Sequence, residues 1–239
     1  MIHLEKPLLL MGFQLNKAIK SQLKLINKKM ETKIIDSLIN AFEAKLDILN
    51  IFMNVGASID EIENLQNTIK QKLPGSYIQL LKKYNGEKRI LGFMAGFGYS
   101  SIEDVIRDWA FFKNAPETQP AGINQLKKIK NTLYSPKRIP FAHDGSGNFI
   151  CIDYDPNFDG ISGQILYLPA GDPEPISVIA DNFDNFLTLI IEKIESEELE
   201  LIDEREDWDE EDWDKAEINF CKTWKDDWTD IAEEYNSKL

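Results

Sequence analysis

The sequence has few of the residues from which metal sites, disulfide frameworks and histidine-based active sites are built. It contains two cysteines, Cys151 and Cys221, and two histidines, His3 and His143, in 239 residues. Two distant cysteines supply neither a disulfide framework nor a CxxC pair for zinc, and two histidines are too few for a histidine-rich site. We therefore expect free thiols, a cytoplasmic location and no metal or other cofactor.

Long apolar segments are also missing. The longest run without a charged residue, 90–102, has 13 residues, whereas a membrane-spanning helix needs about 20. The short apolar run 7–16 has no small-residue cleavage signature, and lysines follow it at once, so we do not expect a signal peptide. Apolar residues still make up 43% of the chain, which is enough for a packed core.

Positive charge is scarce near the C-terminus. Residues 1–190 contain 21 Lys+Arg and 21 Asp+Glu, whereas residues 191–239 contain six and 20, so the whole net charge of −14 lies in the last 49 residues. The first 30 residues have the opposite balance, with six lysines against Glu5. A general nucleic-acid binder needs a cationic surface, so this composition argues against direct binding of nucleic acid. Charge blocks of this kind are typical of solvated faces or interaction segments.

Apolar residues spaced by three and four predict helices over most of the first half. The expected helices cover residues 8–29, 31–55, 58–72, 76–84, 101–112 and 124–132. In the second of these, the predicted buried stripe comprises Ile35, Leu38, Phe42, Leu46 and Leu49. Ser58 with Glu61, and Ser101 with Asp104, have the spacing of N-terminal capping boxes.

From residue 139 the pattern changes to consecutive strands. We expect them at 139–142, 149–153, 163–168 and 175–180, separated by turns rich in Asp, Gly and Asn, with a closing helix at 182–196. The glycine-interrupted segment 90–99 is consistent with one or two more strands. The sequence thus predicts helices first, then several consecutive strands and finally a helix. This order is typical of an α+β fold.

Four motifs occur in the order typical of a known family. They are Leu73-Pro74-x-x-Tyr77-x-x-Leu80-x-x-x-Tyr84-Asn85-Gly86; the helix around Trp109; Ile139-Pro140-Phe141-Ala142-x-Asp144-Gly145-Ser146-Gly147-Asn148 followed by Cys151-x-Asp153; and Gly163-Gln164-Ile165 followed by Ala180-Asp181-Asn182-Phe183-x-x-Phe186-Leu187. Through this ordered set, residues 58–195 resemble the Smi–Knr superfamily, also called SUKH.

The resemblance implies one α+β domain with a curved, mainly antiparallel sheet flanked by helices, and no catalytic residues. Bacterial members are commonly immunity proteins that neutralise a toxin, often a nuclease, and fungal members are scaffolds in cell-wall regulation. We expect a helical extension over 1–55, with 1–29 loosely held, a Smi–Knr-like domain over 56–198, and an acidic, Trp-rich tail over 199–239. The long extension and the tail depart from the family pattern and leave the partner open.

Several motifs resemble catalytic or metal sites but lack a required feature. The loop 144–148 is followed by a strand and not by the helix that a phosphate loop needs, so a tight hairpin is the better interpretation. The acidic run 153–160 is close to a calcium loop, but Phe158 and Gln164 occupy its sixth and twelfth positions. His143 beside Asp144 lacks the further histidines of a metal phosphohydrolase. We therefore predict neither an enzyme nor a metal site.

The acidic tail allows three interpretations. On a helical wheel, one side carries Trp213, Phe220, Trp224, Trp228, Ile231 and Tyr235. This side packs on the rest of the chain, or it docks onto a cationic partner, or the basic helix 15–29 lies against the acidic tail. The first two are compatible, because a packed helix still exposes its acidic back.

These observations together predict a non-enzymatic protein of immunity type, which sequesters a cytoplasmic toxin by occlusion. The expected partner is a nuclease whose cationic cleft meets a dense carboxylate surface. The alternative is an intracellular scaffold or regulatory adaptor of the cell-wall-regulator type. The candidate contact residues are Asp144, Asp153, Asp155, Asp159, Asp207, Trp208, Asp209, Glu210, Glu211, Asp212 and Trp213.

Overall fold

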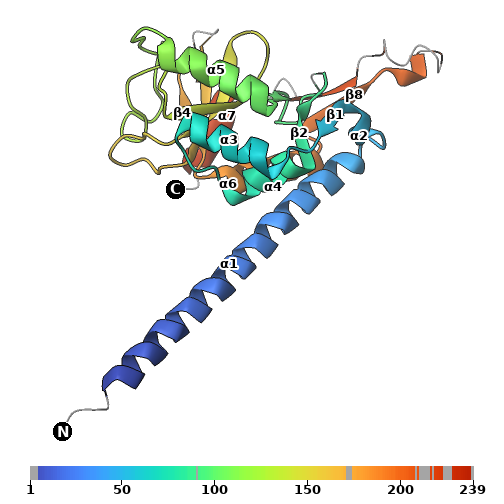
Figure 1. The fold of residues 1–239 in the computed structure, drawn as a ribbon. Helices are drawn as coiled ribbons and strands as arrows, with labels where there is room; N and C mark the ends of the chain where they lie inside the picture. Colours follow the sequence, from blue (N-terminus) through green and yellow to red (C-terminus); the bar gives the residue numbers. More distant parts are fainter. Residues whose placement is uncertain are drawn as a thin grey trace.

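The fold is given by a computed structural model that describes residues 5–89, 91–170, 174–207, 209, 216, 218–222 and 228–237. Its elements, in chain order, are α1 (Glu5–Glu43), α2 (Leu49–Phe52), β1 (Met53–Val55), α3 (Ile59–Ile69), α4 (Gly75–Lys83), β2 (Tyr84–Glu87), β3 (Gly98–Tyr99), α5 (Ile102–Asn114), β4 (Arg138–His143), β5 (Asn148–Asp153), β6 (Gln164–Pro169), β7 (Ser177–Ala180), α6 (Phe183–Glu195), β8 (Leu199–Asp203), the 3-10 turn η1 (Arg205–Asp207), β9 (Ile218–Lys222) and α7 (Trp228–Ser237). Figure 1 shows helices packed around a central sheet, with α1 extending away from the body.

A five-stranded antiparallel sheet, in the order β3-β4-β5-β6-β7, forms the centre of the fold. Each strand pairs with its neighbour in the chain, so the sheet is a meander. Strands β4 to β7 lie where the sequence predicts them. Two small antiparallel pairs, β1-β2 and β8-β9, lie outside this sheet. The structure therefore confirms the α+β class.

The central sheet is buried on both faces. On β5, Ile150 and Ile152 belong to the larger hydrophobic core, whereas Cys151 between them belongs to a smaller one. Successive side chains of a strand point to opposite faces, so the two cores lie on opposite sides of the sheet. The larger core includes side chains from α1, α3, α4 and α6. Phe112 of α5 and Ile129 of the following loop help to close the smaller core.

Two capping boxes begin helices α3 and α5, as their spacing predicts. The hydroxyl of Ser58 accepts the backbone N–H of Glu61, and the Glu61 side chain accepts the Ser58 N–H in return. Ser101 and Asp104 form the same reciprocal pair at α5. These bonds satisfy backbone donors that the helix cannot satisfy internally, which is why both starts are readable from sequence.

Helix α1 is continuous over 39 residues, whereas the sequence predicts two helices with a break near residue 30. Its chain has no Gly or Pro between residues 13 and 55, so nothing interrupts the helix. The predicted stripe is confirmed, because Ile35, Leu38 and Phe42 are buried. The helix ends at Glu43, earlier than expected, and the rest of the stripe is buried in the following turn and α2.

The expected helix at 124–132 is absent, and this segment is a loop. Its backbone carbonyls bond to side chains from the sheet. Arg138 donates to the carbonyls of Lys130, Thr132 and Leu133, and Gln164 donates to that of Lys128. Side chains from two strands of the sheet therefore fix the path of this loop.

The tail also differs from the single helix that its aromatic spacing suggests. Phe220 lies on β9, which pairs antiparallel with β8 from Leu199↔Lys222 to Asp203↔Ile218. Only α7, within the described part of the tail, is an α-helix. Neither α7 nor any other helix in the described ranges combines the length and the apolar character needed to cross a bilayer.

Candidate binding surface

The Asp144 carboxylate stabilises the hairpin between β4 and β5. It accepts hydrogen bonds from the backbone N–H groups of Ser146 at 2.7 Å and Asn148 at 3.1 Å, and from the Asn148 side-chain amide at 2.7 Å. Gly145 and Gly147 have φ values of 79° and 103°, which fit the predicted tight turn. Asp144 thus has a structural task, and its carboxylate is largely occupied within the loop.

Asp153, predicted as a surface charge, is fully buried and unavailable to a partner. Its exposed fraction is 0%, and that of Arg138 opposite it is 1%, with 3.8 Å between Arg138 Nε and Asp153 Oδ1. The carboxylate also accepts hydrogen bonds from Gln164 Nε2 and the Asp155 backbone, each at 3.0 Å. Burial raises the pKa of Asp153, while the Arg138 charge opposes that shift. This residue belongs to the core and not to a docking face.

Asp155 lies near the surface but is paired within the chain. Its Oδ1 is 2.7 Å from Lys130 Nζ and 3.5 Å from Lys137 Nζ. Burial acts to raise the pKa of Asp155, but the hydrogen bond and charge of Lys130, with the charge of Lys137, outweigh it and lower the pKa. Asp159 in the same turn is exposed. These contacts leave the turn much less anionic than its sequence suggests.

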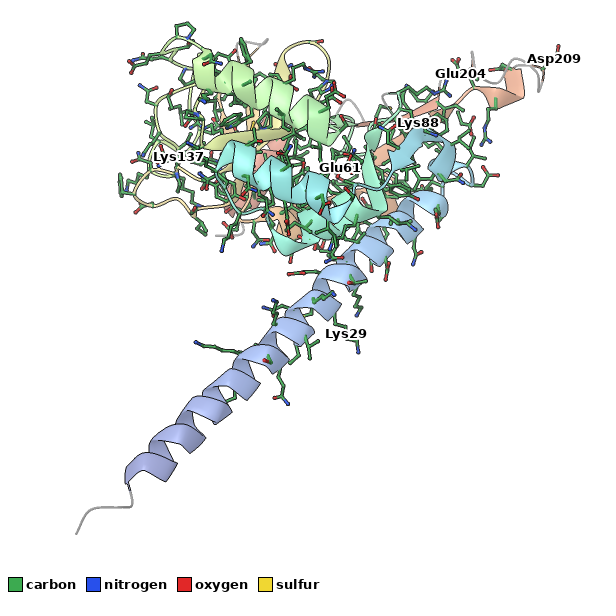
Figure 2. The ribbon with its side chains drawn as sticks, viewed as in Figure 1. Lys29, Glu61, Lys88, Lys137, Glu204 and Asp209 are labelled. Atoms are coloured by element: carbon green, nitrogen blue, oxygen red, sulfur yellow. The ribbon has the colours of Figure 1, made fainter. Side chains whose placement is uncertain are left out.

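The predicted contact residues do not form one surface. Figure 2 places Lys137, which pairs with Asp155, at one end of the body, and Glu204 and Asp209 at the other. Asp207 and Asp209 are exposed. The remaining predicted residues, Trp208, Glu210, Glu211, Asp212 and Trp213, lie outside the described residues. The two acidic groups that were predicted to act together are therefore separate in space.

An acidic arm extends from the body beyond the central sheet (Figure 1). We use this name for β8, η1 and β9, which span residues 199–207, 209, 216 and 218–222 of the described chain. Phe220 anchors its base: its N–H donates to the Leu91 carbonyl at 2.6 Å, and its ring packs edge-on against Phe42 with centroids 4.7 Å apart. The exposed carboxylates of the arm belong to Glu200, Glu204, Asp207 and Asp209.

One cation of the arm is neutralised by its neighbours. Arg205 binds Asp203 through two nitrogens, at 2.9 and 2.6 Å, and approaches Asp47 at 3.4 Å. The hydrogen bonds from Arg205 hold the pKa of Asp203 below its usual value. The charge of Arg205 is therefore paired with Asp203 and Asp47.

A small groove lies between α6 and α7. Its floor is apolar and includes Ile179, Leu189 and Ile231, while Glu192 and Glu234 contribute carboxylates; its volume is about 160 Å³. A cavity near 150 Å³ holds a benzene-sized group, so this groove accepts about one side chain. Lys193 lies 3.5 Å from Glu234 and also pairs with Glu198.

Helix α7 packs on the rest of the chain. Trp228 is 2% exposed, stacks on Tyr167 with centroids 5.7 Å apart and meets Phe97 edge-on at 5.4 Å. Ile231 is 4% exposed. The interpretation that the tail packs on its own domain is therefore confirmed for α7, and these aromatics are core residues and not docking residues. The basic part of α1 does not lie against the acidic arm, because Figure 2 shows Lys29 and Asp209 far apart.

The residues that the structure describes form no cluster of metal-ligating side chains. They contain no group of three His, Cys, Asp or Glu side chains close enough to hold a metal ion. Cys151 is buried, and burial raises the pKa of its thiol, so it is a poor nucleophile.

Glu87 is a half-buried acid that the sequence did not single out. Its carboxylate accepts the backbone N–H groups of Leu91 at 2.5 Å, Phe93 at 2.9 Å and Tyr99 at 2.9 Å, and so shapes the loop against which the acidic arm is anchored. Burial raises the pKa of Glu87 to about 7, although these amides act in the opposite direction. No pattern around Glu87 in the sequence signals this role, because its donors lie four to 12 residues away.

Comparison with family models identifies the central part of the chain. The model of the SMI1 / KNR4 family (SUKH-1) matches residues 56–189, from the end of β1 into α6. The match includes the whole central sheet and leaves out α1, the acidic arm and α7. No curated protein matches the chain.

Proposed function

Because this chain belongs to the SMI1 / KNR4 family (SUKH-1), we propose that it is a non-enzymatic immunity-type protein. It binds a cognate protein toxin in the cytoplasm and neutralises it by covering the active site. The proposed toxin is a nuclease with a cationic cleft. The observation that carries the proposal is an arm with exposed carboxylates that extends from the family-matched body.

The electrostatic argument concerns the rate and specificity of binding. A nuclease presents Lys and Arg to hold phosphates, and an inhibitor with a matching negative potential is steered to that surface. The acidic arm presents Glu200, Glu204, Asp207 and Asp209 to solvent. Each exposed charge contributes little alone, so the effect depends on several charges close together.

The proposed contact set is narrower than the one predicted from sequence. We retain Asp207, Asp209 and the tail residues Trp208, Glu210, Glu211, Asp212 and Trp213, and we add Glu200 and Glu204. We remove Asp153 because it is buried, and Asp144 and Asp155 because contacts within the chain occupy their carboxylates. Asp159 is exposed, but we leave it out because it lies in the turn of Asp155, whose partner Lys137 is at the opposite end of the body from the arm (Figure 2).

The α6–α7 groove supports the proposal independently of the arm. An apolar floor next to carboxylates suits a Lys or Arg side chain, whose stem is apolar and whose head is cationic. Glu192 provides an exposed carboxylate at the groove, whereas Glu234 already pairs with Lys193 at 3.5 Å. A single basic side chain of the toxin is the proposed occupant.

The test uses the purified protein and the toxin domain encoded beside its gene. We expect excess protein to abolish the toxin's activity, and D207K/D209K to slow association by roughly tenfold or more at low salt, because steering depends on this charge. The matched control, E63K/E117K, makes the same change in net charge at exposed acids far from the arm in the sequence. Undiminished toxicity with excess wild-type protein contradicts the proposed function. Equal slowing by both variants contradicts the role of the arm.

A second candidate is an intracellular scaffold or regulatory adaptor. The observation that favours it is the amount of chain outside the family match, which includes α1, the arm and α7. An adaptor recruits several partners weakly, whereas an immunity protein has one tight partner encoded nearby. Pulldown with the intact chain, together with the position of its gene, distinguishes the two.

A further inference from the structure

Residues 19–30 of α1 lie in the part of this helix that extends from the body (Figure 2). Every side chain from residue 19 to residue 30 is exposed, and burial begins with Glu31 and Ile35. Figure 2 shows this part, marked by Lys29, extending well beyond the body. We call residues 19–30 the free half of α1. Packing on this protein's own core therefore does not explain its sequence.

The free half carries an apolar stripe. Ile19, Leu23, Ile26 and Met30 follow one another at steps of four, three and four residues and are 45%, 53%, 53% and 64% exposed. Such steps place side chains on one side of a helix. We call these four residues the exposed stripe. In a soluble segment with no partner, four large apolar side chains on one side are unexpected.

The exposed stripe faces away from the side of α1 that packs on the body. The buried side is marked by Ile35, Leu38, Ile39 and Phe42. At about 100° per residue, the mean direction of the exposed stripe lies about 140° from that of the buried residues. A flat surface can therefore touch the whole exposed stripe while the body stays on the opposite side of the helix.

The charge of the free half determines which surface fits. Lys20, Lys24, Lys28 and Lys29 are exposed, and the free half contains no acidic residue. Lys20 and Lys29 lie about 90° to either side of the exposed stripe. When the stripe lies on a lipid surface, the long side chains of these lysines can reach the lipid phosphates. The uncharged run 7–16 precedes this segment in the sequence and extends its apolar character. Basic flanks around an apolar side are typical of helices that lie in the interface of an anionic bilayer.

A second copy of the chain fits less well. Pairing two free halves brings two lysine-rich segments together, and four stripe residues per copy are far fewer than the 20–30 residues a side of a stable interface. An anionic lipid surface complements the lysines and needs no shape-matched partner.

We propose that the free half of α1 is a peripheral membrane-binding element that lays its exposed stripe on an anionic lipid surface. The bilayer is not crossed. The acidic body, which an anionic surface repels, is held on the aqueous side by the direction of the stripe. This proposal is independent of the proposed function, because it uses neither the acidic arm nor the groove.

The experiment is flotation of the intact protein with lipid vesicles. We expect binding to vesicles with about 30% phosphatidylserine, none to phosphatidylcholine alone, and release when salt is raised from about 0.1 M to about 0.5 M. No binding to the anionic vesicles overturns the proposal.

Two matched pairs of variants test the geometry. Ile26→Ser removes a stripe residue, whereas Leu25→Ser removes its neighbour, which is 67% exposed but lies off the stripe. K20E/K29E reverses the two charges that flank the exposed stripe, whereas K82E/K127E reverses charge at exposed lysines of the body. We expect roughly tenfold or greater loss of vesicle binding in the first member of each pair and little change in the second. Equal loss within either pair overturns the proposal.

Two further measurements exclude other causes. Residues 19–30, Lys82 and Lys127 are exposed, so all four variants should unfold at the wild-type temperature, which excludes misfolding as the cause. Light scattering without lipid shows whether the protein forms a dimer. If Ile26→Ser abolishes a dimer that Leu25→Ser keeps, the exposed stripe serves self-association and the proposal is overturned. D207K/D209K, which tests toxin binding, should bind vesicles as wild type does, so failure of one proposal does not imply failure of the other.

Discussion

Removing the guanidinium of Arg138 should destabilise the protein strongly. The change Arg138→Met keeps most of the apolar stem but leaves Asp153 as a buried carboxylate without its cation. It also removes the donors to the carbonyls of Lys130 at 3.2 Å, Leu133 at 3.1 Å and Thr132. Breaking a buried ion pair by removing one partner costs about 3–5 kcal/mol. Since domains are stable by roughly 5–15 kcal/mol, that is a large fraction of the total.

Urea unfolding followed by tryptophan fluorescence measures this loss. Trp109 is a suitable probe, because its Nε1–H donates to the Pro136 carbonyl at 2.8 Å, close to the loop that Arg138 holds. A double-mutant cycle with Asp153→Asn isolates the pair, and we expect the two changes together to cost less than their sum by about 1 kcal/mol or more. If the free energy of unfolding of Arg138→Met is within about 1 kcal/mol of the wild-type value, the proposal that the Arg138–Asp153 pair organises the 124–133 loop is refuted.

Two other changes probe the loop against which the acidic arm is anchored. Burial raises the pKa of Glu87 to about 7 in the folded protein, whereas in the unfolded chain the carboxyl group has its ordinary pKa of 4.5. The stability that this difference contributes is therefore complete below pH 4.5 and is lost as the pH rises through 7. We expect the free energy of unfolding to fall more between about pH 5 and about pH 8 in wild type than in Glu87→Gln, and equal slopes contradict this. Gly92 has a φ of 80°, and a Cβ atom at this position would lie 2.1 Å from the Phe220 carbonyl oxygen. We therefore expect Gly92→Ala to lower the midpoint temperature of unfolding and to speed backbone hydrogen exchange on β9. The control is Gly163→Ala, because Gly163 has a φ of 96° but a Cβ atom there would meet no atom within 4 Å. This variant bears only the backbone strain of about 1 kcal/mol. An equal loss of stability in both variants means that the close approach of Gly92 to Phe220 is unimportant.

Most elements of the family-matched region were predictable because their signals are local. The capping boxes of α3 and α5 are bonds between residues three apart, so the amino-acid types at those positions are sufficient evidence. Strands β4 to β7 are short apolar runs between turn residues, and a meander pairs each with its neighbour in the chain. Such features need little information from distant residues.

The elements that sequence reasoning missed depend on distant partners. The loop 124–132 follows a path fixed by donors from Arg138 and Gln164. Phe220 lies on a strand because β8 offers a pairing edge and Leu91 accepts its N–H. Helical spacing in the tail is real, but long-range hydrogen bonds and burial override it over residues 218–222.

The candidate site shows the same division. Composition alone placed the negative charge in the last 49 residues and the positive charge at the start of the chain. It did not distinguish Asp153, buried against Arg138, from Asp207, exposed on the arm. Two identical carboxylates differ here only in their neighbours, and neighbours far apart in the chain are brought together by packing of the fold.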